Sequence, residues 1–140
     1  MSQTKPETDG SVALVTGAGS GIGKAIALNL KAAGFRVFIC DVDPDAVESM
    51  QAVGITASVC NVADETAVSA LVAELLATTG GRLDLLVNNA GISGMNAPVE
   101  DVDAEDFRRT MDINVNGTFY FLKEVVPAMK AKGQGAIINI

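Results

Sequence analysis

The segment Thr16-Gly17-Ala18-Gly19-Ser20-Gly21-Ile22-Gly23 separates an apolar run, residues 12–15, from a helix-period segment that ends at Gly34. A strand, a glycine-rich turn and a helix in this order form a phosphate site in α/β sheets. Glycines let backbone N–H groups approach an anion, and the helix N-terminus adds unpaired N–H groups and a positive dipole end. The spacing G-x-x-x-G-x-G matches neither G-x-G-x-x-G nor the P-loop. Alone, the turn fits either a dinucleotide site or an ordinary strand-helix turn.

Composition limits the fold and the partners. A chain of 140 residues with 49% apolar and 19% charged residues is typical of one folded domain. The net charge of −7 argues against binding to nucleic acid, which would be repelled. No apolar run approaches the ~18 residues that cross a bilayer, so no membrane partner is expected. The sequence has no histidine, which excludes Ser-His-Asp catalysis and His-ligated zinc, and no metal site is predicted.

The domain boundary and the cellular location follow from the N-terminus and the cysteines. Residues 1–10 are polar and lack the apolar core of a secretory signal, so we expect a disordered tail followed by one domain over residues 11–140. Cys40 and Cys60 end apolar runs, which favours buried, reduced thiols and a cytoplasmic location.

Strand and helix patterns alternate along the chain. Strands are predicted at residues 12–16, 35–40, 55–60, 83–87 and 136–140. The predicted helices are one from Ile22 to Gly34, one capped by Asp43 and ended by Gly54, one with an apolar stripe over 68–76, and one from Asp103 to about Lys132.

These strands are almost continuously apolar, which is typical of strands buried on both faces of a parallel sheet. We therefore predict an α/β fold with a doubly wound, Rossmann-type parallel sheet, here five strands and four helices of a larger sheet. Ligands bind at the carboxyl ends of such strands. Those ends carry Thr16-Gly17, Asp41, Asn61 and Asn88-Asn89, which should meet at one edge.

Asp41 directly follows the second predicted strand, 18 residues after Gly23, near the point where a dinucleotide fold places a carboxylate on the adenosine ribose. A carboxylate there repels a 2′-phosphate, and neither Ser20 nor Val42 supplies a cation to bind one. These features favour NAD over NADP. The alternative is an ordinary turn aspartate before Asp43.

The segment Asn88-Asn89-Ala90-Gly91 ends the fourth predicted strand. Buried amides need partners, so one asparagine is expected to join neighbouring strands. The backbone at Ala90-Gly91 has almost no side chain and can approach a ligand closely. Taken alone, the segment also fits a simple turn.

Helical geometry places Asn114 within about 20° of Phe107 on the long predicted helix, which points its amide inward. An unpaired amide would be costly there, so a backbone group, a water or a catalytic relay must bond it. Tyr120 lies about 220° from Phe107 and, with Ile113, suggests a second apolar face for another subunit. A homodimer or homotetramer is therefore expected.

With these motifs in order, residues 11–140 resemble a short-chain dehydrogenase/reductase. The glycine segment 16–23, Asn88-Asn89-Ala90-Gly91 and Ile113-Asn114-Val115-Asn116-Gly117 are similar to three motifs of that family. The resemblance implies an NAD cofactor and assigns a role to each matching residue. The pyrophosphate would be lined by Gly17, Gly19, Ser20 and Ile22. Asp41 would hold the adenosine ribose, and the adenine would be flanked by Asn61 and Val62. The nicotinamide would lie by Asn89, Ala90 and Gly91, and Asn114 would hold a water of the proton relay. The family more often has Asp where this chain has Asn61.

The family's catalytic serine, expected just after residues 136–140, and its Tyr-x-x-x-Lys pair are not among these residues. In the family, tyrosine exchanges a proton with the substrate while hydride passes to or from nicotinamide, lysine lowers the tyrosine pKa and serine polarises the carbonyl. The resemblance thus implies an NAD-dependent oxidoreductase of an alcohol or ketone, with a domain incomplete at its C-terminus. Residues 1–140 alone are expected to be inactive. The alternatives are a non-catalytic dinucleotide-binding module and an S-adenosylmethionine-dependent methyltransferase.

Overall fold

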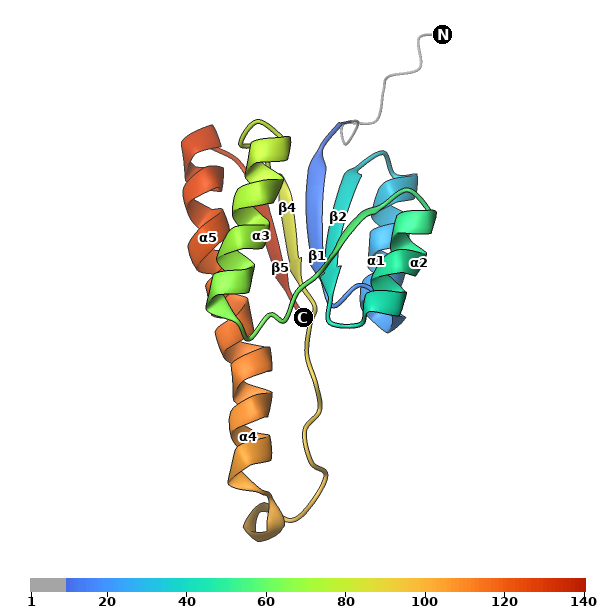
Figure 1. Ribbon diagram of the computed structural model, residues 1–140. Coiled ribbons are helices and arrows are strands. Elements are labelled where there is room, and N and C mark those ends of the chain that lie inside the picture. The colour runs from blue at the N-terminus through green and yellow to red at the C-terminus, as the bar shows by residue number, and fades with distance from the viewer. Residues whose placement is uncertain (1–9) are drawn as a thin grey trace, which may run out of the picture.

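A parallel sheet with strand order β3-β2-β1-β4-β5 forms the centre of residues 10–140, the part of the chain that this computed structural model describes (Figure 1). Residues 1–9, which make up almost all of the tail predicted over residues 1–10, lie outside the described residues. The strands are β1 Val12–Thr16, β2 Arg36–Asp41, β3 Thr56–Val59, β4 Leu85–Asn88 and β5 Ala136–Asn139. All four neighbouring pairs are parallel, so the predicted fold class is confirmed.

Helices cover both faces of the sheet. The helices are α1 Gly21–Ala32, α2 Pro44–Ala52, α3 Glu65–Thr78, α4 Ala104–Met111 and α5 Gly117–Lys132, with a short 3₁₀ turn η1 at Val99–Asp101. Leu14 packs in the cluster beneath α3 and α5, whereas Val15 packs in the cluster beneath α1 and α2. Because every residue of β1 is buried, this strand forms the middle of both cores. Within residues 10–140, no helix has the length and hydropathy to cross a membrane.

Side-chain caps set the start of three helices. Asp43 accepts a hydrogen bond from the backbone N–H of Asp45 at 3.0 Å, with Pro44 in the first turn, as predicted. Asp64 caps α3 and Asp103 caps α4 in the same way. These caps satisfy N–H groups that have no acceptor within the helix.

The long predicted helix contains a π turn, η2 Asp112–Asn116, between α4 and α5. Its first half projects beyond the body of the molecule (Figure 1), and none of its residues is buried. Phe107 is 58% exposed and Asn114 is exposed as well, so the prediction that Asn114 points inward beside Phe107 is wrong. The wider π turn changes the direction in which the side chains after it point, relative to a continuous α-helix. In addition, the projecting half has no sheet beneath it against which side chains could be buried. The buried residues of the long helix lie in α5 and are Gly117, Phe121, Val125 and Met129.

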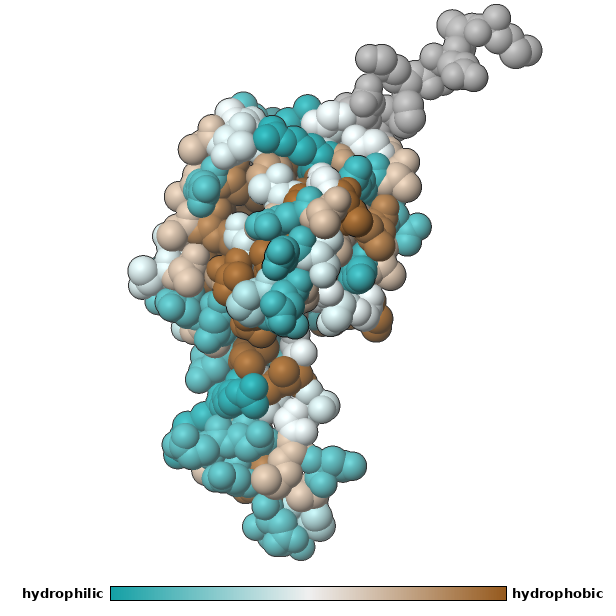
Figure 2. Space-filling view, turned by 45° about the vertical axis from the view of Figure 1, so that its right-hand side comes forward, coloured by the Kyte–Doolittle hydropathy of each residue, from teal (hydrophilic) through white to brown (hydrophobic). Residues whose placement is uncertain are grey.

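The predicted second apolar face is also displaced. Ile113 and Tyr120 are partly buried against the core beneath α3 and α5, so they do not form a free face. The exposed apolar residues instead recur every four positions along α4, η2 and α5, and we call them the α4–α5 stripe: Phe107, Met111, Val115 and Phe119. Figure 2 shows hydrophobic surface where the projecting segment joins the body and mainly hydrophilic surface at its far end.

Leu14→Ala is expected to lower the free energy of unfolding by about 3–5 kcal/mol, because it leaves a cavity in the central strand. The matched variant Leu28→Ala removes the same atoms from a residue of α1 that is 37% exposed. It should cost about 1 kcal/mol or less. Chemical denaturation followed by circular dichroism measures both, and equal losses would contradict the central place of β1.

Candidate functional site

A cavity of about 920 Å³ lies at the carboxyl ends of the strands, as expected for a doubly wound sheet. Its volume falls in the range of small-molecule and cofactor sites. Ten of the eleven residues that we predicted from the sequence line it, and the eleventh, Gly19, donates a backbone hydrogen bond to the side chain of Asp41. The predicted lining residues are Gly17, Ser20, Ile22, Asp41, Asn61, Val62, Asn89, Ala90, Gly91 and Asn114.

The glycine turn after β1 has no room for side chains. At Gly17, where φ is +61°, a Cβ would lie 2.7 Å from Cα of Ala90. At Gly19 it would lie 2.6 Å from Cβ of Ala46. Ser20 is the N-cap residue of α1, and its hydroxyl makes no capping hydrogen bond. The turn therefore presents bare backbone and the N-terminus of a 12-residue helix to the cavity.

The carboxylate of Asp41 joins two turns. Oδ2 accepts a hydrogen bond from the backbone N–H of Gly19 at 2.9 Å, and Oδ1 accepts one from that of Asp43 at 3.0 Å. Asp41 therefore does have the role in a turn that the sequence analysis gave as the alternative. Since a carboxylate offers about four acceptor positions, Asp41 keeps capacity for a ligand in the cavity that it lines.

The two asparagines after β4 have different tasks. Nδ2 of Asn89 donates to the backbone oxygens of Thr16 and Gly17 at 3.0 and 3.1 Å. A Cβ at Gly23 would meet this amide nitrogen. Asn88 lies outside the cavity lining, and its Nδ2 donates to Oδ1 of Asn139 at 2.9 Å, which joins β4 to β5. Both side-chain amides therefore hold parts of the backbone together. The loop that follows them, at Ala90 and Gly91, has almost no side chain and lines the cavity.

The hydroxyl of Thr16 was not selected from the sequence as a site residue. It accepts hydrogen bonds from the backbone N–H groups of Asn89 and Ala90, each at 3.0 Å. Its position directly before Gly17, at the end of a buried strand, is the signal that could have identified it. Thr16 thereby fixes the distance between the glycine turn and the loop after β4.

Asn114 lines the cavity, and its side-chain amide bonds both backbone groups of one residue, Ile92. Oδ1 accepts from the N–H of Ile92 at 2.8 Å, and Nδ2 donates to the carbonyl of Ile92 at 2.7 Å. A backbone partner was one of the possibilities left open. Asp106 adds a second tie to the same loop, because its Oδ2 accepts from the N–H of Met95 at 2.6 Å.

Asn61 and Val62 form the wall next to β3. Oδ1 of Asn61 accepts from the N–H of Ala63 at 3.0 Å, which shapes the turn. Val62 is buried, and a Cβ at Gly117 would lie 2.9 Å from its Cγ2. Arg109 of α4 also lines the cavity, and no local sequence pattern identified it.

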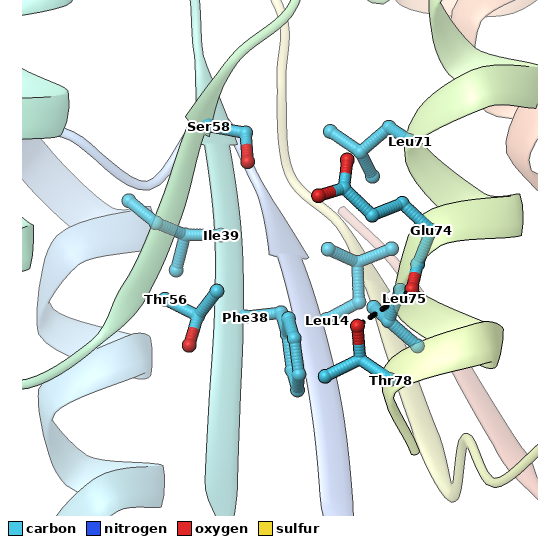
Figure 3. A pocket seen from close by; sticks show the side chains of 9 residues that line it. All are labelled: Leu14, Phe38, Ile39, Thr56, Ser58, Leu71, Glu74, Leu75 and Thr78. Carbon is cyan, nitrogen blue, oxygen red and sulfur yellow. Dashed lines mark hydrogen bonds between the residues drawn. The ribbon is translucent and has the colours of Figure 1, made fainter. Parts of the chain in front are cut away.

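Figure 3 shows a smaller cavity, of about 60 Å³, between β1–β3 and α3. Its polar residues include Glu74 and Thr78, and the Thr78 hydroxyl donates to the carbonyl of Glu74 at 2.8 Å. None of the predicted site residues lines it. The candidate site is therefore the large cavity at the strand ends.

A sequence profile of short chain dehydrogenases matches residues 11–140. The chain belongs to the short-chain dehydrogenase family. It is 40% identical over 133 residues to 2-dehydro-3-deoxy-L-rhamnonate dehydrogenase (NAD(+)) of Sphingomonas sp. (strain SKA58), a match that covers 94% of this chain and 53% of that protein. It is 42% identical over 134 residues to cyclohexanol dehydrogenase of Acinetobacter sp. (strain SE19), covering 91% of this chain and 53% of that one.

Solved structures of the family share the fold. A crystal structure of NAD+-bound xylitol dehydrogenase matches with a TM-score of 0.88 and 39% identity, covering 95% of this chain and 53% of the other. Levodione reductase matches with a TM-score of 0.90 and 33% identity, covering 95% and 54%. The chain thus spans about half the length of the relatives that it matches.

Gly17→Ala is expected to be much more damaging than Gly21→Ala. Both glycines have a positive φ, +61° and +57°, so either alanine carries a strain of about 1–2 kcal/mol. At Gly21 an added Cβ meets nothing within 4 Å, whereas at Gly17 it meets the backbone of Ala90. Urea unfolding should show Gly17→Ala less stable than Gly21→Ala by at least about 2 kcal/mol. Equal effects would contradict the close approach of the two turns.

Proposed function

We propose that this chain binds NAD and forms the cofactor-binding part of an oxidoreductase that transfers hydride between nicotinamide and a small alcohol or ketone. The observation that carries the proposal is the convergence of the glycine turn, Asp41 and the Asn89-Ala90-Gly91 loop on one cavity. Each of these three parts has a distinct chemical fit to a dinucleotide. The named activities of the relatives support the same reaction class.

The pyrophosphate fits the glycine turn. Gly17 and Gly19 leave the backbone uncovered, and the first turn of α1, at Ser20 and Ile22, offers N–H groups and a positive dipole end. The first turn of α1 contains no acidic residue that would repel an anion. These residues would hold the pyrophosphate through backbone N–H groups and the Ser20 hydroxyl.

The adenosine half fits the wall made by Asp41, Asn61 and Val62. Asp41 would accept hydrogen bonds from the ribose hydroxyls, and buried Val62 would pack against the adenine. Among the described residues that line the cavity, Arg109 supplies the positive charge, and it comes from α4 rather than from the loop after Asp41. This arrangement favours NAD over NADP, as do the relatives whose names include NAD(+) or bound NAD+.

The nicotinamide end fits the loop after β4, at Asn89, Ala90 and Gly91. Nicotinamide, when bound, supplies or accepts the hydride. Ala90 and Gly91 would let it approach the backbone, and the Asn89 amide would keep that backbone in place through Thr16 and Gly17.

Asn114 is proposed to hold the relay water through its main-chain oxygen. Its side-chain amide is bonded at both ends to Ile92. Its carbonyl lies in the π turn, where it accepts from the Thr118 hydroxyl at 3.3 Å. A carbonyl oxygen has a second lone pair for a water.

Residues 11–140 are proposed to be the cofactor domain of a longer, cytoplasmic enzyme. The family's serine and its Tyr-x-x-x-Lys pair, which move the proton of the reaction, would lie outside these residues, so residues 1–140 would bind NAD without turnover. Binding without turnover by the whole protein would instead favour a non-catalytic module. Preference for S-adenosylmethionine over NADH would favour a methyltransferase.

A homodimer or homotetramer is proposed to form through the α4–α5 stripe. Its four apolar residues are each 40–58% exposed, and α4 has no buried residue of its own in a single copy. Water would be excluded from the stripe when two copies pair.

Asp41→Asn is expected to weaken NADH binding about tenfold and to reduce the preference for NADH over NADPH, because the charge that repels a 2′-phosphate is lost. Asp43→Asn is the matched control, since Asp43 caps α2 and does not line the cavity. NADH fluorescence titration, with S-adenosylmethionine as competitor, measures both. No NADH binding by the folded protein, or displacement by S-adenosylmethionine at equal concentration, would refute the NAD proposal.

The double variant Val115→Glu/Phe119→Glu is expected to be a monomer, because two carboxylates would be buried in the interface. Val53→Glu is the control, since Val53 is 49% exposed at the end of α2 and away from the stripe. Analytical ultracentrifugation gives the mass of each species. An unchanged oligomer in the folded double variant would place the interface elsewhere.

A further inference from the structure

The two cysteines of the chain are neighbours beneath the adenosine half of the cavity. Cys40 is the fifth residue of β2 and pairs in register with Ser58 of β3. Cys60 lies two positions after Ser58, on the same face, and its N–H donates to the carbonyl of Asp41 at 3.0 Å. Both side chains belong to the same buried cluster, with exposures of 0% and 4%.

The two neighbouring thiols differ in acidity because each changes the pKa of the other. The neighbouring Cys60 side chain raises the pKa of Cys40, and burial raises it further. The Cys40 side chain lowers the pKa of Cys60, against the opposing effect of its own burial. Cys60 is therefore the sulfur with more thiolate character, and the thiolate is the reactive form of cysteine.

The thiols also differ in access. Cys60 lines the large cavity, whereas Cys40 does not and has no exposed surface. A small oxidant that enters the cavity reaches Cys60 first. Cys40 then stands behind it as the second thiol that a disulfide requires.

We propose that Cys60 and Cys40 are a peroxide-oxidisable pair, and that their reversible disulfide turns off the adenosine half of the site. Thiolate at Cys60 attacks one oxygen of hydrogen peroxide, which breaks the O–O bond, gives a sulfenic acid and releases water after proton uptake. The Cys40 sulfur then attacks the Cys60 sulfur, forming the S–S bond, and the hydroxyl leaves as water with the Cys40 proton. In sum, two thiols and one peroxide give one disulfide and two waters.

The disulfide would act on cofactor binding through the chain neighbours of the cysteines. Asp41 follows Cys40, and Asn61 follows Cys60, so the new bond links the two segments that carry the adenosine contacts. Cys40 pairs in register with Ser58, two positions before Cys60, so the two sulfurs would have to approach to a bond length of about 2.05 Å, which would draw the segment after β3 towards β2. This consequence for cofactor affinity rests on the proposed function, whereas formation of the disulfide does not.

Mass spectrometry of the purified protein after hydrogen peroxide tests the bond itself. We expect a loss of two hydrogen atoms, no thiol left for iodoacetamide, and full reversal by dithiothreitol. Cleavage after Glu48, which lies between the cysteines, should leave two peptides joined until reduction. Sulfinic or sulfonic acid at Cys60 without a cross-link, a disulfide between two chains, or two unreacted thiols would each overturn the proposal.

Cys40→Ala provides the matched control, because it keeps Cys60 but removes its partner. Peroxide should convert this variant to the sulfinic acid, with no loss of two hydrogens. Thermal unfolding shows whether Cys40→Ala folds; Cys40→Ser, which keeps a hydrogen-bond donor, serves as a second version.

NADH titration of the reduced and oxidised protein tests the consequence. We expect at least about fivefold weaker binding after oxidation, recovery with dithiothreitol, and slower oxidation when NADH is present. Equal affinity in the two forms overturns the regulatory part of the proposal. Failure of the reduced protein to bind NADH refutes the proposed function instead, and the disulfide result stands on the mass measurement.

Discussion

The hydrogen bonds between the end of β1 and the loop after β4 hold the site together. These strands are parallel neighbours in the sheet but far apart in the chain, and β1 is followed by α1 whereas β4 is followed by the loop that leads to α4. The Thr16 hydroxyl accepts two backbone N–H groups from that loop, and the Asn89 amide returns two hydrogen bonds to the turn. Because Gly17 has no side chain, the two backbones can lie this close. The separation of the glycine turn and the loop, and hence the width of the cavity, depends on this contact.

Most of the fold could be predicted because the chain's local signals agree with its tertiary structure. Continuous apolar runs indicate buried strands, an Asp-Pro pair such as Asp43-Pro44 indicates the start of a helix, and a glycine after a helical pattern indicates its end. The long helix could not be predicted in detail. Its π turn at Asp112–Asn116 leaves no mark in the apolar pattern, and its projecting half depends on the absence of a neighbouring layer. The helical phase carried forward from Phe107 was therefore wrong.

Residues that lie at the cavity could be predicted from the sequence where backbone geometry requires a residue type. Gly17 and Asp41 stand at strand ends, where topology alone brings them together. Contacts made across long sequence distances were harder, since nothing near Thr16 or Asp106 in the chain shows which backbone group each will bond. Arg109 was not predicted to line the cavity, because its place there depends on how α4 lies relative to the sheet and not on neighbouring sequence. Roles towards a cofactor go beyond geometry and remain proposals.

The projecting α4 gives the molecule two levels of local stability. None of its residues is buried, and two side chains, Asn114 and Asp106, tie this helical segment to the loop that carries Ile92 and Met95. Segments with few buried contacts open at a small fraction of the global unfolding free energy. In amide hydrogen exchange of a single copy, α4 would therefore behave as its own unit, exchanging while β1 stays protected. One wall of the cavity can thus detach and reform without any unfolding of the sheet that bears the other.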